Sequence, residues 1–531
     1  MTSSLSRIWA LVLAFGLTLG AASRADAVTA SCVGNTPLQN TQNVLCGNGV
    51  CTAALVRLTT PIDVTSGGCD FDLGGRDLAI EKLFQMSGNA YIKVVNAKNI
   101  TVAGAGRLQS TGDFYKPDGY ITQGGLISLT ATGTITVDGT ASLDVSGDGG
   151  GVLLLDALGS ISFTGGSPVV KANGISSFAD LGDRYTDGGE LTAVSRNGGI
   201  LVDGELSLTG QNGGTGGIVD LQGAVNVEMR KQVDLSGGGG GGGEIILTAG
   251  DDVLVKRSIN CDSSVGGGDG GSMSFAAGED GIGGIKAGGQ LLIDGDSTIG
   301  LTLRGSSTDT FGGYGGSLDA TSFGLILFDN VTLRLDAATN FDGDGGYLTI
   351  DSSDADYYGV NALDGDLKFT GGLISMTSGN TGGDGGAIDL TAGRDLVITA
   401  DIGVNGFVTG GDVAGTSGRA TVLGGAINSQ GGPPNGSGDG GYIDFESGLG
   451  SDEGGLGTLS VAKNISAFGG AASGGGQSIT LSGCKVSVDP NVKIDGHAGV
   501  NANNFFGGSD IELISRRPMA IGNSSQYLAN P

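Results

Sequence analysis

Histidine, tryptophan and basic residues are scarce in this sequence, and each scarcity argues against a class of function. His497 is the only histidine, so one residue would have to serve every mechanism that needs an imidazole, and Ser-His-Asp or Cys-His catalysis is not expected. Lys and Arg number 27 against 55 Asp and Glu, which gives a formal net charge of −28. Because phosphate binding needs clustered cations, a nucleic-acid partner is not expected, and an anionic membrane would repel the chain.

Proline is scarce as well, and apolar residues rarely recur at the spacing of a helix, whereas glycine is abundant. The chain has 9 Pro and 108 Gly but no Gly-X-Y period, which excludes collagen. Hydrophobic residues make up 38% of the chain and charged residues only 15%, a composition that argues against disorder. After residue 110 no segment places apolar residues at helical spacing over several turns. The composition therefore favours short apolar segments separated by frequent turns.

Residues 1–27 have the features of a secretory signal peptide. Arg7 precedes an apolar run from Ile8 to Leu19, and Ala25-Asp26-Ala27 fits cleavage before Val28. The run is short for a membrane span, and no later segment is apolar enough to be one. We therefore expect an exported protein that is extracellular or at the cell surface, with an outer-membrane-associated or periplasmic location as alternatives.

Export makes disulfide bonds feasible, and four of the six cysteines lie close together near the N-terminus. They predict two bridges, with three connectivities open, that staple an N-terminal cap over residues 28–70. These four are Cys32, Cys46, Cys51 and Cys69.

The other two cysteines, Cys261 and Cys484, are separated by many repeats. A bridge needs α-carbons within about 7 Å, so we predict two unpaired thiols. Strand parity predicts that both face the core, with Cys261 in a place held by leucine or valine in neighbouring repeats.

A Gly-Gly pair followed by alternating apolar residues recurs along the chain. In one copy, Gly242-Gly243 is followed by Ile245 and Leu247. Adjacent copies start about 25 to 55 residues apart, which is typical of a solenoid coil with a variable insertion. Other copies begin at Gly124, Gly188, Gly216, Gly270, Gly315, Gly345, Gly385 and Gly440.

Within one coil the alternation predicts three short strands. After Ile245 and Leu247, the pair Val253 and Val255 alternates, and then Ile259 and Cys261. Each pair is too short to form a core alone, but stacking at about 4.8 Å per coil joins equivalent pairs into one apolar column. The fold class expected is all-β: a single right-handed parallel β-helix of roughly 12–15 coils and roughly 65–70 Å. It would span residues 71–515, followed by a C-terminal cap or tail at 516–531.

The glycine runs are interpreted as turns between coils, where positive φ costs glycine nothing. The two largest excursions are then the run Gly237 to Gly243 and the segment Gly403 to Gly441. The second contains Pro433-Pro434 and is predicted to be the longest insertion and a mobile surface loop.

The repeat pattern resembles that of a known group of proteins. The motif Gly-Gly-x-[Ile/Leu/Val]-x-[Leu/Phe] with Thr-Ala-Gly turns, as at residues 386–393, resembles bacterial exported β-helix proteins, which include haemagglutinin-like adhesin repeats. The resemblance covers about residues 70–515 and implies a cell-surface or secreted location and an adhesive role. Neither a two-partner-type secretion domain nor an autotransporter barrel is recognisable, so the resemblance does not explain attachment.

Two short segments could carry catalysis or could be ordinary turns. Gly250-Asp251-Asp252 resembles one motif of the pectin-hydrolase family, but the Gly-His-Gly and Arg-Ile-Lys elements of that family are absent. Gly and Asp are default turn residues, so we interpret this motif as a turn and His497 as an exposed turn residue. Aromatic platforms for sugar rings are also not evident: Tyr and Phe are scattered, with Tyr357-Tyr358 and Phe505-Phe506 as the doublets.

A calcium site is the remaining candidate, since no cofactor is required by this pattern. Hard oxygen ligands gather at Asp342-Gly343-Asp344 and continue with Asp351, Asp354 and Asp356. The spacing matches neither an EF-hand nor the glycine-rich nonapeptide repeat, and a solvated acidic loop is the alternative.

The sequence therefore predicts a non-enzymatic, exported structural or adhesive β-solenoid with a polysaccharide or another surface component as its partner. The alternative is a polysaccharide lyase or hydrolase of the β-helix type. A third hypothesis is a rigid stalk that presents the segment 403–441 to a partner.

Overall fold

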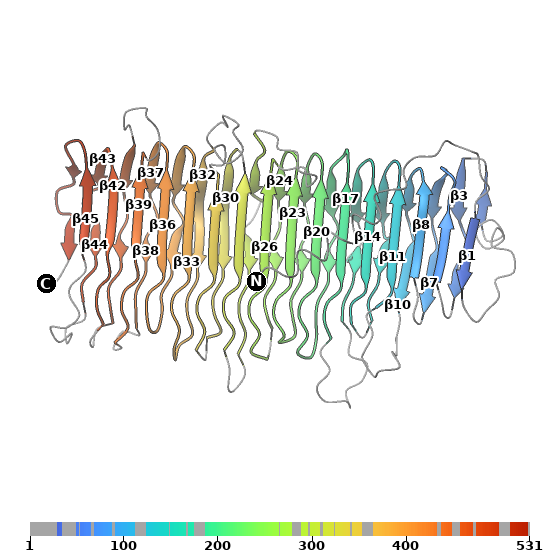
Figure 1. Ribbon diagram of the computed structural model, residues 1–531, viewed down its shortest axis with the longest axis horizontal. Helices are drawn as coiled ribbons and strands as arrows, with labels where there is room; N and C mark the ends of the chain where they lie inside the picture. The colour runs from blue at the N-terminus through green and yellow to red at the C-terminus, as the bar shows by residue number, and fades with distance from the viewer. Residues whose placement is uncertain are drawn as a thin grey trace.

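The computed structural model describes most of the chain after residue 28, and the described part is built from strands without helices. The strands lie side by side in a row along one long axis, from β1 at one end to β45 at the other (Figure 1). The described residues are 29–33, 49–52, 54–64, 68–87, 91–111, 124–147, 149–165, 168–174, 186–264, 266–278, 288–295, 298–307, 312–322, 324–339, 342–352, 365–432, 437–448, 457–470, 474–498 and 510–528. The predicted signal peptide, Cys46, Asp354, Asp356 and both aromatic doublets lie outside them.

One sheet, called sheet A, has sixteen strands, and all but the first run parallel to one another. At about 4.8 Å per step the parallel part spans roughly 65–70 Å. Its strands are β1 (Thr29–Val33), β5 (Gly68–Asp72), β8 (Tyr91–Ala97), β11 (Leu126–Ala131), β14 (Val152–Ala157), β17 (Glu190–Ser195), β20 (Ile218–Gly223), β23 (Glu244–Ala249), β26 (Ser272–Ala277), β29 (Ser317–Ser322), β31 (Tyr347–Asp351), β33 (Ala387–Ala392), β36 (Asp412–Ser417), β39 (Ile443–Ser447), β42 (Ile479–Gly483) and β45 (Ile511–Ser515).

The second sheet, sheet B, has 31 strands and holds the second and third strand of each coil. Its strands are β2 (Gly49–Cys51), β3 (Leu55–Leu58), β4 (Ile62–Val64), β6 (Asp77–Ile80), β7 (Leu83–Ser87), β9 (Ile100–Val102), β10 (Arg107–Thr111), β12 (Ile135–Gly139), β13 (Ser142–Asp144), β15 (Ile161–Gly165), β16 (Val170–Lys171), β18 (Ile200–Asp203), β19 (Leu206–Ser207), β21 (Val227–Met229), β22 (Val233–Asp234), β24 (Val253–Val255), β25 (Ile259–Asn260), β27 (Leu291–Ile293), β28 (Ile299–Thr302), β30 (Ile326–Arg334), β32 (Leu367–Ser375), β34 (Asp395–Ile398), β35 (Asp401–Gly403), β37 (Ala420–Leu423), β38 (Ile427–Asn428), β40 (Thr458–Val461), β41 (Ile465–Ser466), β43 (Lys485–Val488), β44 (Lys493–Asp495), β46 (Ala520–Ile521) and β47 (Gln526–Leu528).

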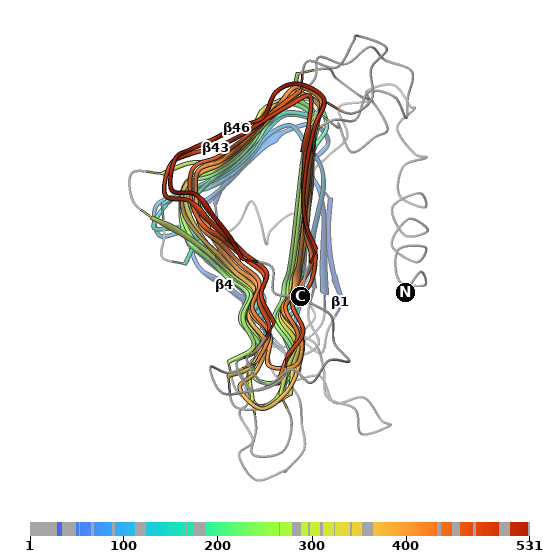
Figure 2. The same cartoon turned by 90° about the vertical axis from the view of Figure 1, so that its left-hand side faces the viewer.

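The coil formed by β23, β24 and β25 shows how alternation produces the fold. Each of its strands pairs in parallel with the equivalent strand one coil later, namely β26, β27 and β28. Viewed along the long axis, the described strands superimpose in a triangular outline (Figure 2). In two coils the second and third strands merge into one long strand, β30 or β32. The all-β, parallel, solenoid-like stack predicted from the sequence is therefore confirmed.

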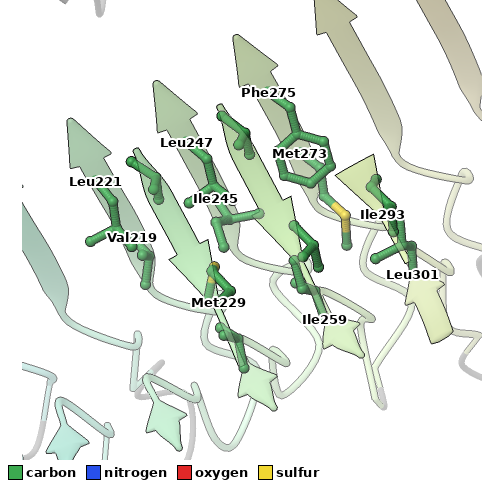
Figure 3. Packing of buried hydrophobic residues seen from close by; sticks show 14 of the residues in the cluster. Val219, Leu221, Met229, Ile245, Leu247, Ile259, Met273, Phe275, Ile293 and Leu301 are labelled. Carbon is green, nitrogen blue, oxygen red and sulfur yellow. The ribbon is translucent and has the colours of Figure 1, made fainter. Parts of the chain in front are cut away.

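The core is a set of columns that run along the stack. Ile245 of β23 lies between Val219 of β20 and Met273 of β26, and all three are fully buried. Figure 3 shows these side chains and their neighbours pointing inward from successive strands. Cys261 is a free, fully buried thiol whose pKa burial raises well above its usual value, so it packs as a small apolar residue.

The Gly-Gly pairs lie at the turns between coils, as predicted, but they owe their glycine to a close approach of two backbones, so the expectation of positive φ was wrong for the pairs. At the turn that joins one coil to the next, the second glycine donates its N–H to the residue after the third strand of the preceding coil, as Gly243 does to the Leu235 carbonyl at 2.8 Å. A Cβ on Gly216 would lie 1.8 Å from that same carbonyl oxygen. The φ angles of these two glycines are outside the left-handed region, whereas Gly239 and Gly241 in the adjoining run do adopt it.

The segment 403–441 contains a regular coil at residues 412–428, so its prediction as one long loop was wrong, while Pro433-Pro434 lies outside the described residues. Residues 412–428 contribute β36, β37 and β38, which pair in register with the coils on either side. Gly415 and Thr421 occupy inward positions, and Thr421 is fully buried with a hydrogen bond of 2.8 Å to Ser417. Because these inward residues are small or hydroxylated, the apolar alternation is lost from the sequence although the fold continues.

The ends of the stack differ from the predicted boundaries. At the N-terminal end β1 pairs antiparallel with β5, and β3 and β4 already belong to the parallel ladder. At the other end β46 and β47 continue the ladder of β43 and β44. Cys484 is free, but it lies half-buried at the corner between β42 and β43, so the prediction that it faces the core was wrong. Strand parity does not carry through a corner.

Asp366 is expected to make stability depend on pH at the acidic end. It is 7% exposed, and burial alone would raise its pKa, but hydrogen bonds from Arg394 at 2.6 Å and Lys368 at 2.7 Å lower it to about 2. The ionised carboxylate therefore stabilises the fold fully above pH about 4, and the contribution is lost as pH falls through about 2.

The size of this effect should be about 1–2 kcal/mol, since both cations are half-exposed and screened. Urea unfolding followed by circular dichroism at pH 7 and at steps between pH 4 and 2 measures it. We expect Asp366→Asn to be less stable than the wild type at pH 7 and to have a flatter pH dependence. An Asn variant with the wild-type acid profile would contradict the assignment.

Candidate functional surface

The candidate site is the outer face of sheet A, which carries a group of carboxylates and two exposed tyrosines. Because successive side chains of a strand point to opposite faces, the residue directly after each Gly-Gly pair points outward, as does every second residue after it. Parallel pairing then stacks equivalent outward residues into rows that run along the solenoid axis. Two regions of this face differ from the rest.

The first region is an acidic group on three adjacent strands. Asp220 of β20 lies in the row between Thr192 of β17 and Ile246 of β23. Half-burial raises its pKa most strongly, and the negative charges of Glu190 and Glu244 add to the rise. Two hydrogen bonds from the Gln222 amide, at 3.0 and 3.1 Å, favour the ionised form and act in the other direction. A carboxyl with a raised pKa beside other carboxylates is the arrangement from which a general acid can be built.

The second region is a row with two exposed tyrosines. Tyr347 begins β31, Ala387 and Asp412 follow it in register, and Tyr442 comes next, directly before β39. The Tyr442 N–H donates to the Asp412 carboxylate at 3.2 Å, which fixes it in this row. The tyrosines are 62% and 51% exposed and stand three coils apart, about 14 Å at the usual strand spacing.

Carboxylates alternate with small residues in the neighbouring outward row. Asp319, Asp389 and Asp444 occupy every second strand of this row. Thr349 and Ala414 lie between them. The face between the two tyrosines therefore carries hydrogen-bond acceptors about 10 Å apart along the axis.

The calcium candidates do not form one cluster. The Asp342 carboxylate accepts from the Thr381 hydroxyl at 3.2 Å, and the Asp344 carboxylate accepts from the Asp384 N–H at 2.8 Å, so both bind the next coil. Asp351 lies at the far end of β31 from this loop. Among the described residues no group of three or more Asp, Glu, His or Cys side chains is arranged to hold a metal ion.

The two catalytic hypotheses from the sequence have different outcomes. Gly250-Asp251-Asp252 forms the corner between β23 and β24, which confirms the turn. The prediction that His497 is exposed was wrong: its ring is half-buried, stacks on Phe468 with centroids 5.0 Å apart, and bonds the carboxylate of buried Asp495. Burial would raise the Asp495 pKa, but contacts with His497 and Lys493 lower it.

The sequence pattern alone does not predict these outward rows, although it contains a signal for them. Tyr347, Tyr442, Glu190 and Glu244 each directly follow a Gly-Gly pair. Once that pair marks the start of a sheet A strand, the next residue must point outward. Which of these residues share a region depends on the order of the coils.

Comparisons with known proteins do not add a function. The described residues contain no helix that is long and apolar enough to cross a membrane. No family model, no curated protein and no solved structure matches this chain.

Proposed function

We propose that this chain is an exported β-solenoid that acts as a structural or adhesive element at the cell surface or in the extracellular matrix, without catalysis. The observation that supports this most is the outer face of sheet A, which offers exposed tyrosines and carboxylates in register along a stiff stack. A continuous core and a ladder that joins every coil to the next make such a stack a rigid presenting surface.

The finer architecture is part of the same proposal. The coils close as a right-handed parallel β-helix, supported by hydrogen bonds across the turn between consecutive coils, such as that from Gly271 N–H to the Cys261 carbonyl at 2.9 Å. A disulfide-stapled N-terminal cap is supported by the register of β1 and β5, which places Cys32 directly opposite Cys69. Cys69 is disulfide-bonded and fully buried, and an antiparallel pair brings two α-carbons within bridging distance.

A polysaccharide hydrolase is the second candidate, and Asp220 is the observation that favours it. A half-buried carboxyl with a raised pKa can donate a proton to a glycosidic oxygen while a neighbouring carboxylate acts as base or nucleophile. Glu190 and Glu244 are the neighbours available for that role.

Two assays of the purified full chain separate these functions. Beads coated with the protein should be retained on cells and on isolated matrix material, while uncoated beads wash off. Incubation with neutral and acidic polysaccharides should release no new reducing or unsaturated ends. Retention without cleavage supports the scaffold or adhesin, and loss of retention in a folded, β-rich protein would overturn it.

If reducing ends do appear, the acidic group predicts their origin. Asp220→Asn should then lower the rate about 100-fold or more, the usual scale for removing a general acid. Asp319→Asn is the matched control, because Asp319 belongs to the same outward row but lies three strands further along. Equal activity of both variants would remove Asp220 from any mechanism.

A further inference from the structure

We infer that the row from Tyr347 to Tyr442 binds a linear, uncharged polysaccharide that lies along the solenoid axis across β31, β33, β36 and β39. This inference rests on the proposed adhesive function and names the ligand class and the surface. It concerns a face that no other described segment covers, since both rings are more than half exposed.

The aromatic rings supply the affinity. An exposed tyrosine is a large apolar plate with a polar tip, which suits one face of a pyranose ring carrying C–H groups. Ala387 stands in the row between the tyrosines, and Ala414 stands beside Asp412 in the next row. These small side chains leave room for an extended ligand to reach from one ring to the other.

The direction of the row sets the shape of the ligand. Both tyrosines lie in one row along the axis, so a ligand that contacts both must cross the strands over about 14 Å. A polymer with a regular repeat meets this requirement, and the coil spacing of about 4.8 Å is close to one sugar unit of an extended chain. Asp389 and Asp444 can accept hydrogen bonds from hydroxyl groups beside such a chain.

The charge of the surface sets the class of polysaccharide. Asp412 lies within the row, Asp389 and Asp444 flank it, and the whole chain carries a net charge of −28. An anionic polymer such as a polyuronate would be repelled at low and moderate ionic strength. Ionised carboxylates are strong acceptors for sugar hydroxyls, so a neutral polysaccharide gains hydrogen bonds from the same carboxylates that repel an anionic one.

Binding of the full chain to soluble neutral glucans, mannans and xylans, with polygalacturonate as the anionic probe, tests this inference by affinity electrophoresis. We expect retardation by at least one neutral polymer and none by polygalacturonate. Tyr347→Ala and Tyr442→Ala should each weaken binding about tenfold, and the double variant should abolish it. Tyr347→Phe should bind as the wild type, because the ring is retained.

Tyr314→Ala is the matched control. Tyr314 is 51% exposed, as Tyr442 is, but it precedes the Gly315-Gly316 pair and lies outside sheet A. An equal loss in Tyr314→Ala would show that the tyrosines act without the row. Binding only to polygalacturonate, or only to protein-coated surfaces, would overturn the ligand class.

The bead assay keeps this inference separate from the proposed function. Beads that adhere to cells while no neutral polymer binds would refute the ligand and leave the adhesive function standing. Beads that do not adhere, with neutral polymers still bound through the tyrosines, would refute adhesion and leave the binding surface. Unchanged thermal midpoints in the tyrosine variants, whose side chains are exposed, establish that lost binding is not lost folding.

Discussion

Gly242→Ala is expected to destabilise the stack by about 3 kcal/mol or more, far above the usual effect of adding one methyl group. The new Cβ would lie 1.7 Å from the carbonyl oxygen of Cys261 and 2.5 Å from the backbone nitrogen of Gly271. The Gly271 N–H already donates to this Cys261 carbonyl at 2.9 Å, across the turn between the two coils. Side-chain repacking cannot relieve a clash with two fixed backbone groups, so the coil would have to open at this point.

Gly300→Ala is the matched control, because Gly300 also lies in a coil but its added Cβ would meet only ordinary van der Waals contacts. The nearest atom to its added Cβ is the Ser258 hydroxyl oxygen at 3.5 Å, and its φ is outside the left-handed region. We expect this variant to stay within about 0.5 kcal/mol of the wild type. Urea unfolding by circular dichroism compares the two, and hydrogen exchange of β23 to β26 locates the loss. Equal stability of both variants would show that close approach is not what requires glycine at position 242.

The period-two signal is strong enough to place strands in this protein, and weak where inward residues are not apolar. Ile245, Leu247, Val253 and Val255 fall on the strands that alternation predicts and are all fully buried. Residues 412–428 adopt the same arrangement with Gly415 and Thr421 inside, and their sequence looks like a loop. A stack supplies the missing information, since a coil with few apolar residues is held by the registers above and below it.

Glycine shows a second limit of the sequence. Positive φ and close backbone approach both select glycine, so Gly241 and Gly242 look alike along the chain. The structure separates them: Gly241 has a φ of 134°, and Gly242 is pressed against Cys261. The deciding contact comes from a residue nineteen positions later, which local patterns do not report.

For the candidate surface, the alternation of side chains along a strand predicts which residues point outward, but not which of them lie next to each other. The Gly-Gly pair before Tyr347 and Tyr442 is enough to place both side chains outward. That the two belong to one row, with Ala387 and Asp412 between them, depends on which segments form complete coils. Because the sequence of residues 403–441 indicates an insertion, it predicts one coil too few between the two tyrosines and therefore does not give their spacing.

Phe445→Ala is expected to destabilise the protein strongly, because the Phe445 ring packs on Gly415 of the coil at residues 412–428. Phe445 of β39 is fully buried, and a Cβ on Gly415 of β36 would lie 2.4 Å from its ring and 2.9 Å from the Leu396 side chain. The ring therefore fills the volume that a side chain at position 415 would occupy in an ordinary coil. Phe445→Ala should cost about 3–5 kcal/mol, since it removes a large buried side chain and leaves a cavity that glycine cannot fill.

A double-mutant cycle tests whether the two residues share one space. Gly415→Ala alone should cost about 1–3 kcal/mol through overpacking against the ring. Combined with Phe445→Leu, whose shorter side chain withdraws from position 415, the loss should be smaller than the sum of the single losses. Urea unfolding of the four proteins measures this coupling. If 403–441 were a mobile loop, Gly415→Ala would be neutral and the two changes would add independently, whereas a coil requires the coupling because the two residues meet across adjacent strands of sheet A.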